Sequence, residues 1–181
     1  MSKGKNRGGV TTTGAQTVNV DANFSRPADT TQYAAGDVVS NATGTTHTYI
    51  TFSNCAQALG GSGQIVSAAC VSSTVEATKP DFELFIFDTA PTKMEDNAAF
   101  DPTDAEMRTV VGVIAFAQAN WKQGKAGATG TGNSRCEGST GVYGFVCASA
   151  SKDLYGVLVE RATYTPISAE RFDFRLDIQQ D

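Results

Sequence analysis

The stretch RFDFRLDI, residues 171–178, decides the fold class of this chain. Large apolar side chains alternate in it with charged ones: Phe172, Phe174, Leu176 and Ile178 take one set of positions, and Arg171, Asp173, Arg175 and Asp177 the other. Because successive side chains of a β-strand point to opposite faces of the sheet, this alternation predicts a strand with one buried and one solvated face.

Strand-like segments also fill most of the sequence before this stretch. Short runs rich in β-branched and aromatic residues recur between turn residues, at 17–24, 36–41, 47–52, 64–78, 82–87, 109–121, 142–150 and 153–164. No segment between them is long enough for the helix that connects parallel strands, so a parallel α/β architecture is excluded. We therefore predict an all-β fold: an antiparallel β-sandwich of jelly-roll type, or else a barrel.

An acidic connection follows one of these strands. Residues 82–87 are apolar on both faces, which predicts a central strand, and they open into a segment bracketed by Pro91 and Pro102. Thr103 followed by Glu106 three residues later predicts a capping box and one short helical turn. The acidic residues of the segment are Asp88, Glu95, Asp96, Asp101, Asp104 and Glu106.

Three kinds of site have this appearance: a catalytic carboxylate pair, a calcium site and a partner-binding loop. Glycoside hydrolysis would use paired carboxylates, but it also needs a sugar platform, and Trp121 is the only tryptophan. Oxygen ligands for calcium are present at Asp88, Asp96, Asn97, Asp101 and Asp104, but without the spacing of an EF-hand. We interpret residues 88–106 as a stiffened connection that either caps the sandwich or touches a neighbour. The candidate partner-binding residues in it are Asp96, Asn97 and Asp101.

Motifs for common enzyme chemistries are missing from the sequence. It has no P-loop and no dinucleotide fingerprint, and GGSGQ at 60–64 lacks the strand-to-helix context of a nucleophile elbow. The four cysteines form no C-x-x-C pair, so we expect free thiols in a reducing compartment and no zinc site: Cys55, Cys70, Cys136 and Cys147. We predict a protein that is not an enzyme, with no catalytic residue, cofactor or metal.

The charge of the chain is unevenly distributed. Residues 1–20 contain Lys3, Lys5 and Arg7 and no acid; because the whole chain carries −5, residues 21–181 carry −8. Residues 1–17 have one large apolar side chain after Met1, too few to offset the entropy of ordering. We predict an extended N-terminal arm, residues 1–20, held by a partner through its three basic residues. A single domain, residues 21–181, follows it, with a Gly-rich loop or hairpin arm at about 122–141.

Two classes of partner are excluded by these features. A net charge of −5 argues against binding nucleic acid through the bulk of the protein. No apolar run approaches the ~20 residues of a membrane helix, and no signal peptide precedes Val10, so we expect the chain to be made in a cytoplasm.

Four stretches of the sequence resemble a known family. They are ANFSRPADTTQYAAGDVVSN at 22–41, PDFELFIFDTAP at 80–91, DNAAFDPTDAE at 96–106 and YGVLVERATYTPISAERF at 155–172. Together they resemble small head decoration, or cement, proteins that tailed bacteriophages encode near the major capsid gene. The resemblance covers most of residues 22–172 and is weaker in the arm and at 122–141.

This resemblance implies a structural role. It implies that the chain binds the exterior of an icosahedral capsid in the virion and bridges neighbouring subunits of the major capsid protein. It also implies a homo-oligomer, a trimer or a dimer, at capsid symmetry axes. The alternative from the residues is a glycan- or receptor-binding β-sandwich on a phage tail or head, for which the aromatic material is Trp121, Tyr143 and Tyr155.

Overall fold

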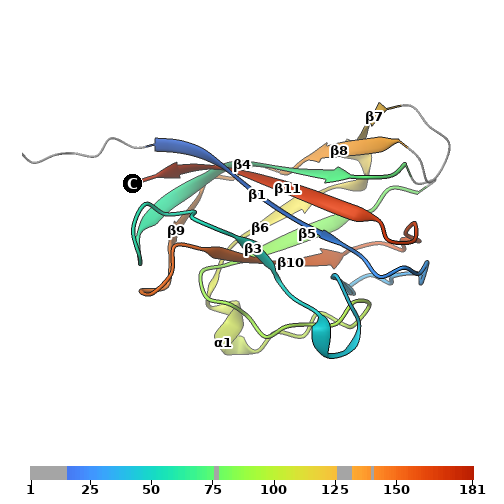
Figure 1. Cartoon of the computed structure of the whole chain (residues 1–181), viewed down its shortest axis with the longest axis horizontal. Helices are drawn as coiled ribbons and strands as arrows, with labels where there is room; N and C mark the ends of the chain where they lie inside the picture. The colour runs from blue at the N-terminus through green and yellow to red at the C-terminus, as the bar shows by residue number, and fades with distance from the viewer. Residues whose placement is uncertain (1–15, 76–77, 126–131, 140) are drawn as a thin grey trace, which may run out of the picture.

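The computed structural model describes residues 16–75, 78–125, 132–139 and 141–181, and in these residues the protein is almost entirely β (Figure 1). The strands are β1 (Gln16–Ser25), β2 (Val38–Val39), β3 (Ile50–Phe52), β4 (Ser62–Ser72), β5 (Phe82–Phe87), β6 (Val110–Phe116), β7 (Lys122–Lys125), β8 (Asn133–Glu137), β9 (Tyr143–Val146), β10 (Leu154–Glu160) and β11 (Arg171–Gln180). One short helix, α1 (Asp104–Met107), and two 3₁₀ turns, Gly44–Thr46 and Gln118–Asn120, complete the described elements.

The strands form two antiparallel sheets. The first sheet has the order β1-β11-β4-β8-β7, with β9 also on β4; the second has the order β2-β10-β5-β6, with β3 also on β10. The pairs are nested along the chain, because β1 pairs with β11, β3 with β10, β4 with β9 and β5 with β6. The predicted all-β antiparallel sandwich is confirmed.

The main core lies between the two sheets. From β11 it receives the four alternating side chains predicted above, of which Phe174 is 2% exposed and Phe172, Leu176 and Ile178 are 0% exposed. Arg171 and Arg175, on the opposite face, are exposed. Phe82 meets Phe172 edge to face at 5.1 Å between ring centroids, and this contact joins the two sheets.

β5 is central, as its two-sided pattern predicts. It pairs with β10 on one side and β6 on the other. Phe82, Leu84 and Ile86 enter the main core, whereas Phe85 and Phe87 enter a second apolar cluster on the outer face of the second sheet.

Residues 88–106 cover this second cluster. Phe100 packs on Phe85 with 4.5 Å between ring centroids, and Met94 packs against the same cluster. Thr103 and Glu106 form the predicted capping box at the start of α1. Of the two roles considered for this segment, the structure therefore shows the first: it caps the sandwich.

Several predicted boundaries are wrong. β1 begins at Gln16 and pairs with β11 along its whole length, so residues 16–20 belong to the domain and not to the arm. The strand predicted over 109–121 ends at Phe116. Of the loop and the hairpin arm considered for residues 122–141, the structure shows the hairpin: β7 pairs with β8, and β8 pairs with β4.

The four cysteines are free and buried, as predicted. Cys70 lies directly opposite Cys136 in the pairing of β4 with β8. Among the described residues, no helix is both long and apolar enough to cross a membrane.

Candidate partner-binding surfaces

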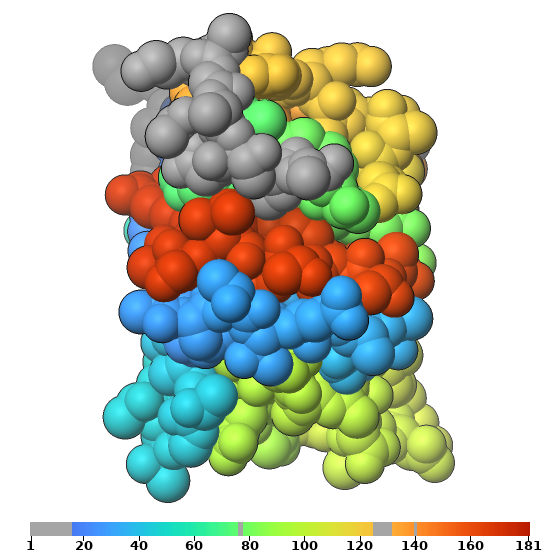
Figure 2. All heavy atoms as spheres, turned by 90° about the vertical axis from the view of Figure 1, so that its right-hand side faces the viewer, coloured from blue at the N-terminus to red at the C-terminus, as the bar shows by residue number. Residues whose placement is uncertain are grey.

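The four stretches that carry the resemblance meet at one end of the sandwich. Tyr33, from the first stretch, pairs in a β-bridge with Tyr164, from the last. The Tyr164 ring packs edge to face on Phe82, from the second stretch, with 6.0 Å between centroids. Figure 2 shows this end, where the segment that follows β1 lies beside the segment that precedes β11 and above residues 88–103. Segments far apart in the sequence thus form one continuous unit.

A buried ion pair lies inside this unit. The Arg26 guanidinium donates through Nη2 to Asp96 Oδ2 at 3.2 Å, and both side chains are at most 2% exposed. Asp96 Oδ1 also accepts from Tyr33 Oη at 2.6 Å and from the Ser40 backbone N–H at 2.8 Å. Burial raises the pKa of Asp96 above its ordinary value, although the hydrogen bonds from Tyr33 and Ser40 oppose this shift.

The prediction that Asp96 binds a partner is therefore wrong. Its carboxylate is committed to groups inside the protein, and it is 5% exposed. The physical role of Asp96 is to tie the segment 88–106 to the loop after β1. An unpaired charge in this position would be costly, because a buried carboxylate needs its cation and hydrogen-bond donors.

The other predicted contact residues differ in their placement. Asn97 is half-buried and adopts a φ of 62°, and its N–H donates to the Val38 carbonyl at 2.8 Å. This left-handed conformation suits asparagine better than most residues, which gives Asn97 a local structural role. Asp101 is exposed. Lys3, Lys5 and Arg7 lie outside the described residues.

A second carboxylate of the connection, that of Glu106, is also engaged within the protein. Glu106 accepts the backbone N–H of Thr92 at 2.6 Å and that of Thr103 at 2.8 Å. These bonds lower the pKa of Glu106 to about 2, with Thr92 as the largest cause. In the part of the chain that the structure describes, no group of three or more His, Cys, Asp or Glu side chains is arranged to hold a metal ion.

The three aromatic residues considered for a glycan platform do not come together. Trp121 is 7% exposed, and its Nε1 donates to the Pro80 carbonyl at 2.9 Å in the core. Tyr143 is half-buried, and its hydroxyl donates to the Val113 carbonyl at 2.8 Å. Tyr155 is half-buried on the second sheet, where it meets Tyr49 edge to face at 5.1 Å. The prediction that these three residues form one aromatic platform is therefore wrong.

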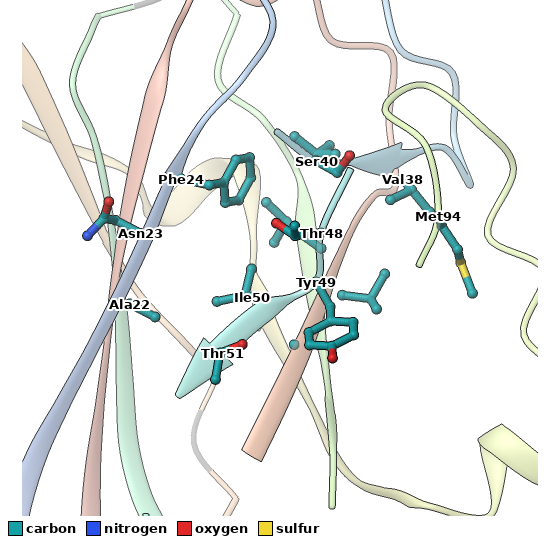
Figure 3. A pocket seen from close by; sticks show the side chains of 14 residues that line it. Ala22, Asn23, Phe24, Val38, Ser40, Thr48, Tyr49, Ile50, Thr51 and Met94 are labelled. Atoms are coloured by element: carbon teal, nitrogen blue, oxygen red, sulfur yellow. The ribbon is translucent and has the colours of Figure 1, made fainter. Parts of the chain in front are cut away.

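A pocket of about 260 Å³ opens in the seam between β1 and the edge of the second sheet. Figure 3 shows Phe24 and Ile50 pointing toward each other across it, while Asn23 points away from β1 to the other side. Ser40 and Thr48 supply hydroxyl groups to its lining, and Met94 reaches it from residues 88–106.

The pocket exists because two short strands share one edge of β10. β3 pairs with Leu154–Gly156 and β2 with Leu158 and Val159, so neither strand covers Val157. Sequence reasoning missed this gap, although the shortness of the segments at 36–41 and 47–52 was a signal for it. The volume suits one apolar side chain from a partner, since pockets for whole small-molecule ligands usually measure about 300–1,000 Å³.

In comparisons with known proteins, no family model and no curated protein matches the chain.

Proposed function

We propose that this chain is a non-enzymatic structural protein of a tailed-phage virion. In this proposal it decorates and cements the capsid exterior by bridging neighbouring subunits of the major capsid protein. The observation that carries the proposal is the resemblance of four stretches to head decoration proteins. Support comes from their arrangement, because these stretches pack together through the Tyr33–Tyr164 bridge and the Arg26–Asp96 pair.

The order of the strands supports a jelly roll as the finer description of the fold. In a jelly roll, four nested antiparallel pairs roll up into two facing sheets. The nesting of β1 with β11, β3 with β10, β4 with β9 and β5 with β6 is that pattern, with the β7–β8 hairpin inserted between β6 and β9. We infer a jelly roll with one inserted hairpin.

The β-sandwich domain has two features that a cementing protein would use. The gap beside Val157 would receive an apolar side chain of the capsid protein, and a buried anchor of this kind contributes much of the energy of an interface. The loop that flanks this pocket is stiffened by Asp96, which bonds Ser40, so little ordering would be required on binding. Many copies on one shell would multiply weak individual contacts.

The experiment that tests this proposal compares particles with and without the protein. The chain should co-sediment with intact heads and be absent from isolated tails. Stripped particles should lose their DNA at a lower temperature, or at a milder osmotic shock, than particles to which the protein has been added back. Equal retention of DNA by stripped and decorated particles would reject cementing.

Variants at the seam pocket make this test specific. Ile50→Trp would fill the pocket and should weaken binding to particles, because the anchor could no longer enter. Glu137→Gln alters an exposed carboxylate on β8, outside the pocket lining, and serves as the matched surface control. Thermal unfolding of the free variants must be measured first, so that a loss of binding is not a loss of folding.

The alternative function retains one favourable observation. Tyr49 and Tyr155 form a half-exposed aromatic pair, and Tyr49 also lines the seam pocket. A glycan- or receptor-binding role would use this pair, and no longer Trp121. Binding on a glycan array that Tyr49→Ala abolishes, without effect on particle stability, would favour this alternative over cementing.

A further inference from the structure

The end of the sandwich that carries β9 has an exposed apolar surface. Leu59, Val142 and Val146 are 64%, 66% and 60% exposed, and together we call them the β9 patch. Val142 and Val146 share one side of the strand with Gly144, because alternate residues point the same way. Leu59 precedes Gly61, whose carbonyl accepts the Cys147 N–H just beyond β9 at 2.9 Å. Apolar patches of this kind mark interaction sites on soluble proteins.

A groove runs beside β9. Within the described strands β9 pairs only with β4, so its other edge has no strand partner. The groove, which we call the β6–β9 groove, has a volume of about 460 Å³ and is lined by residues of β4 as well as of β6 and β9. Val111 and Val146 are among its apolar lining, and Asp88 and Asp181 are its carboxylates. An unpaired edge beside an apolar floor is a template for an added strand.

The residues before β1 have the matching chemistry. Lys3, Lys5 and Arg7 supply three positive charges to meet the carboxylates, and no acid accompanies them. The run VTTT at 10–13 follows them and consists of β-branched residues, which favour strands. Basic residues followed by a β-branched run fit a groove with acidic side chains and valine walls.

The position of β1 brings these residues to the correct end of the molecule. Gln16 pairs with Gln180, Gln180 with Gly63, and Gly63 with Phe145, so β1 begins in the same row of residues as β9. Figure 1 shows the start of β1, the C-terminus and β9 at this same end. Three strand spacings separate Gln16 from β9, or ~14 Å. The residues before Gln16 can extend ~50 Å, which is enough to reach a neighbouring molecule.

From this juxtaposition we infer that residues 3–13 of a second copy of this chain add as a strand in the β6–β9 groove. The exchange is reciprocal, so two copies meet end to end in a two-fold dimer. A second copy fits better than the arm of the same chain, because Leu59 and Val142 lie outside the groove lining. If the arm lay in the groove of its own chain, Leu59 and Val142 would stay exposed. Contact between the domains of two copies would cover both residues. The inference does not depend on the proposed role in capsids.

A charge-swap experiment on the full chain tests the exchange. Sedimentation velocity at a series of protein concentrations should show a dimer that weakens as salt rises, because exposed charge pairs are screened. Asp88→Lys and Lys5→Glu should each weaken the dimer roughly tenfold, which corresponds to about 1.4 kcal/mol. The two substitutions together should restore part of the affinity, since they reverse the sign of the charge on both sides of the proposed contact.

Matched controls separate this inference from general effects of charge. Asp101→Lys makes the same change at an exposed acid of the same connection that lies outside the groove lining, and it should leave the dimer unaffected. Val142→Asp should weaken the dimer by disrupting contact between the bodies. A chain that is monomeric at every concentration, or single variants that the double variant fails to rescue, would overturn the inference. A monomer that still binds particles would leave the proposed function standing.

Discussion

Glu160, at the end of β10, should make the stability of the protein depend on pH. Its side chain is 0% exposed. Oε1 accepts the backbone N–H groups of Asp81, Arg161 and Ala162 at 3.0, 3.1 and 2.9 Å, whereas Oε2 has no hydrogen-bond partner among the described residues. Burial raises the pKa of Glu160 from 4.5 to about 7, although the three N–H groups oppose the shift.

The sign and size of the effect follow from proton linkage. The folded state holds the Glu160 proton more tightly than the unfolded state does, so the stability that this group contributes is complete below pH 4.5 and is lost as the pH rises through about 7. Between the two pKa values the loss amounts to about 3 kcal/mol. Glu160→Gln keeps an oxygen acceptor and cannot ionise, so it should lose nothing in this window. The amide N–H₂ that replaces Oε2 adds a cost that does not vary with pH.

Urea unfolding of the wild type and Glu160→Gln at several pH values between 4.5 and 8 measures this difference directly. The free energy of unfolding of the wild type minus that of the variant should fall by about 3 kcal/mol as the pH rises. Glu106→Gln is a control whose difference from the wild type should stay constant in this range, because the lowered pKa of Glu106 confines the loss of its contribution to the interval from pH 4.5 down to about 2. A difference between the wild type and Glu160→Gln that stays constant over this pH range would refute the reasoning.

Three further predictions concern packing and thiols. Phe174→Ala should cost roughly 3–5 kcal/mol in urea unfolding, because the ring is buried, whereas Arg175→Ala should cost less than ~1 kcal/mol, because its pair with Asp21 is exposed; equal costs would contradict the observed faces of β11. Gly112→Ala should cost about 1–3 kcal/mol, since its new Cβ would lie 2.6 Å from the Tyr143 ring, and Gly144→Ala, with nothing within 4 Å, is the matched control that should leave stability nearly unchanged. Alkylation followed by mass spectrometry should label four thiols after unfolding and almost none before, because burial raises the pKa of Cys55 to about 12 and shields all four from reagent; rapid labelling of native protein, or a disulfide in protein kept from air, would count against this.

The fold could be predicted where the sequence pattern is local. The alternating pattern of β11 predicts one buried face, and the apolar pattern of β5 predicts two. Both predictions are confirmed. The capping box of α1 likewise lies within four residues of sequence. Such features depend on neighbours in the chain, so a single sequence contains them.

The candidate site could not be predicted to the same extent, because it depends on distant residues. Asp96 looks like a solvated acid in a loop, and only the fold brings it to Arg26 and Tyr33, which are 70 and 63 positions away. Trp121 looked like a surface platform, but its indole N–H finds a carbonyl in the core at Pro80. The seam pocket depends on the register of two strands against β10, and no local pattern specifies a register between distant segments.

The two ends of the sandwich differ in how much of the family resemblance they contain. The stretches that carry the resemblance form the end built around Arg26 and Asp96, where their most distinctive polar residues are buried and bonded to one another. Those residues therefore specify a framework, and substituting them is expected to affect folding before binding. Val142, Val146 and residues 3–13 lie outside these stretches; the two valines are exposed, and residues 3–13 contain three basic residues and no acid. The proposed dimer should therefore respond to changes at the β9 end, while stability responds to changes at the other.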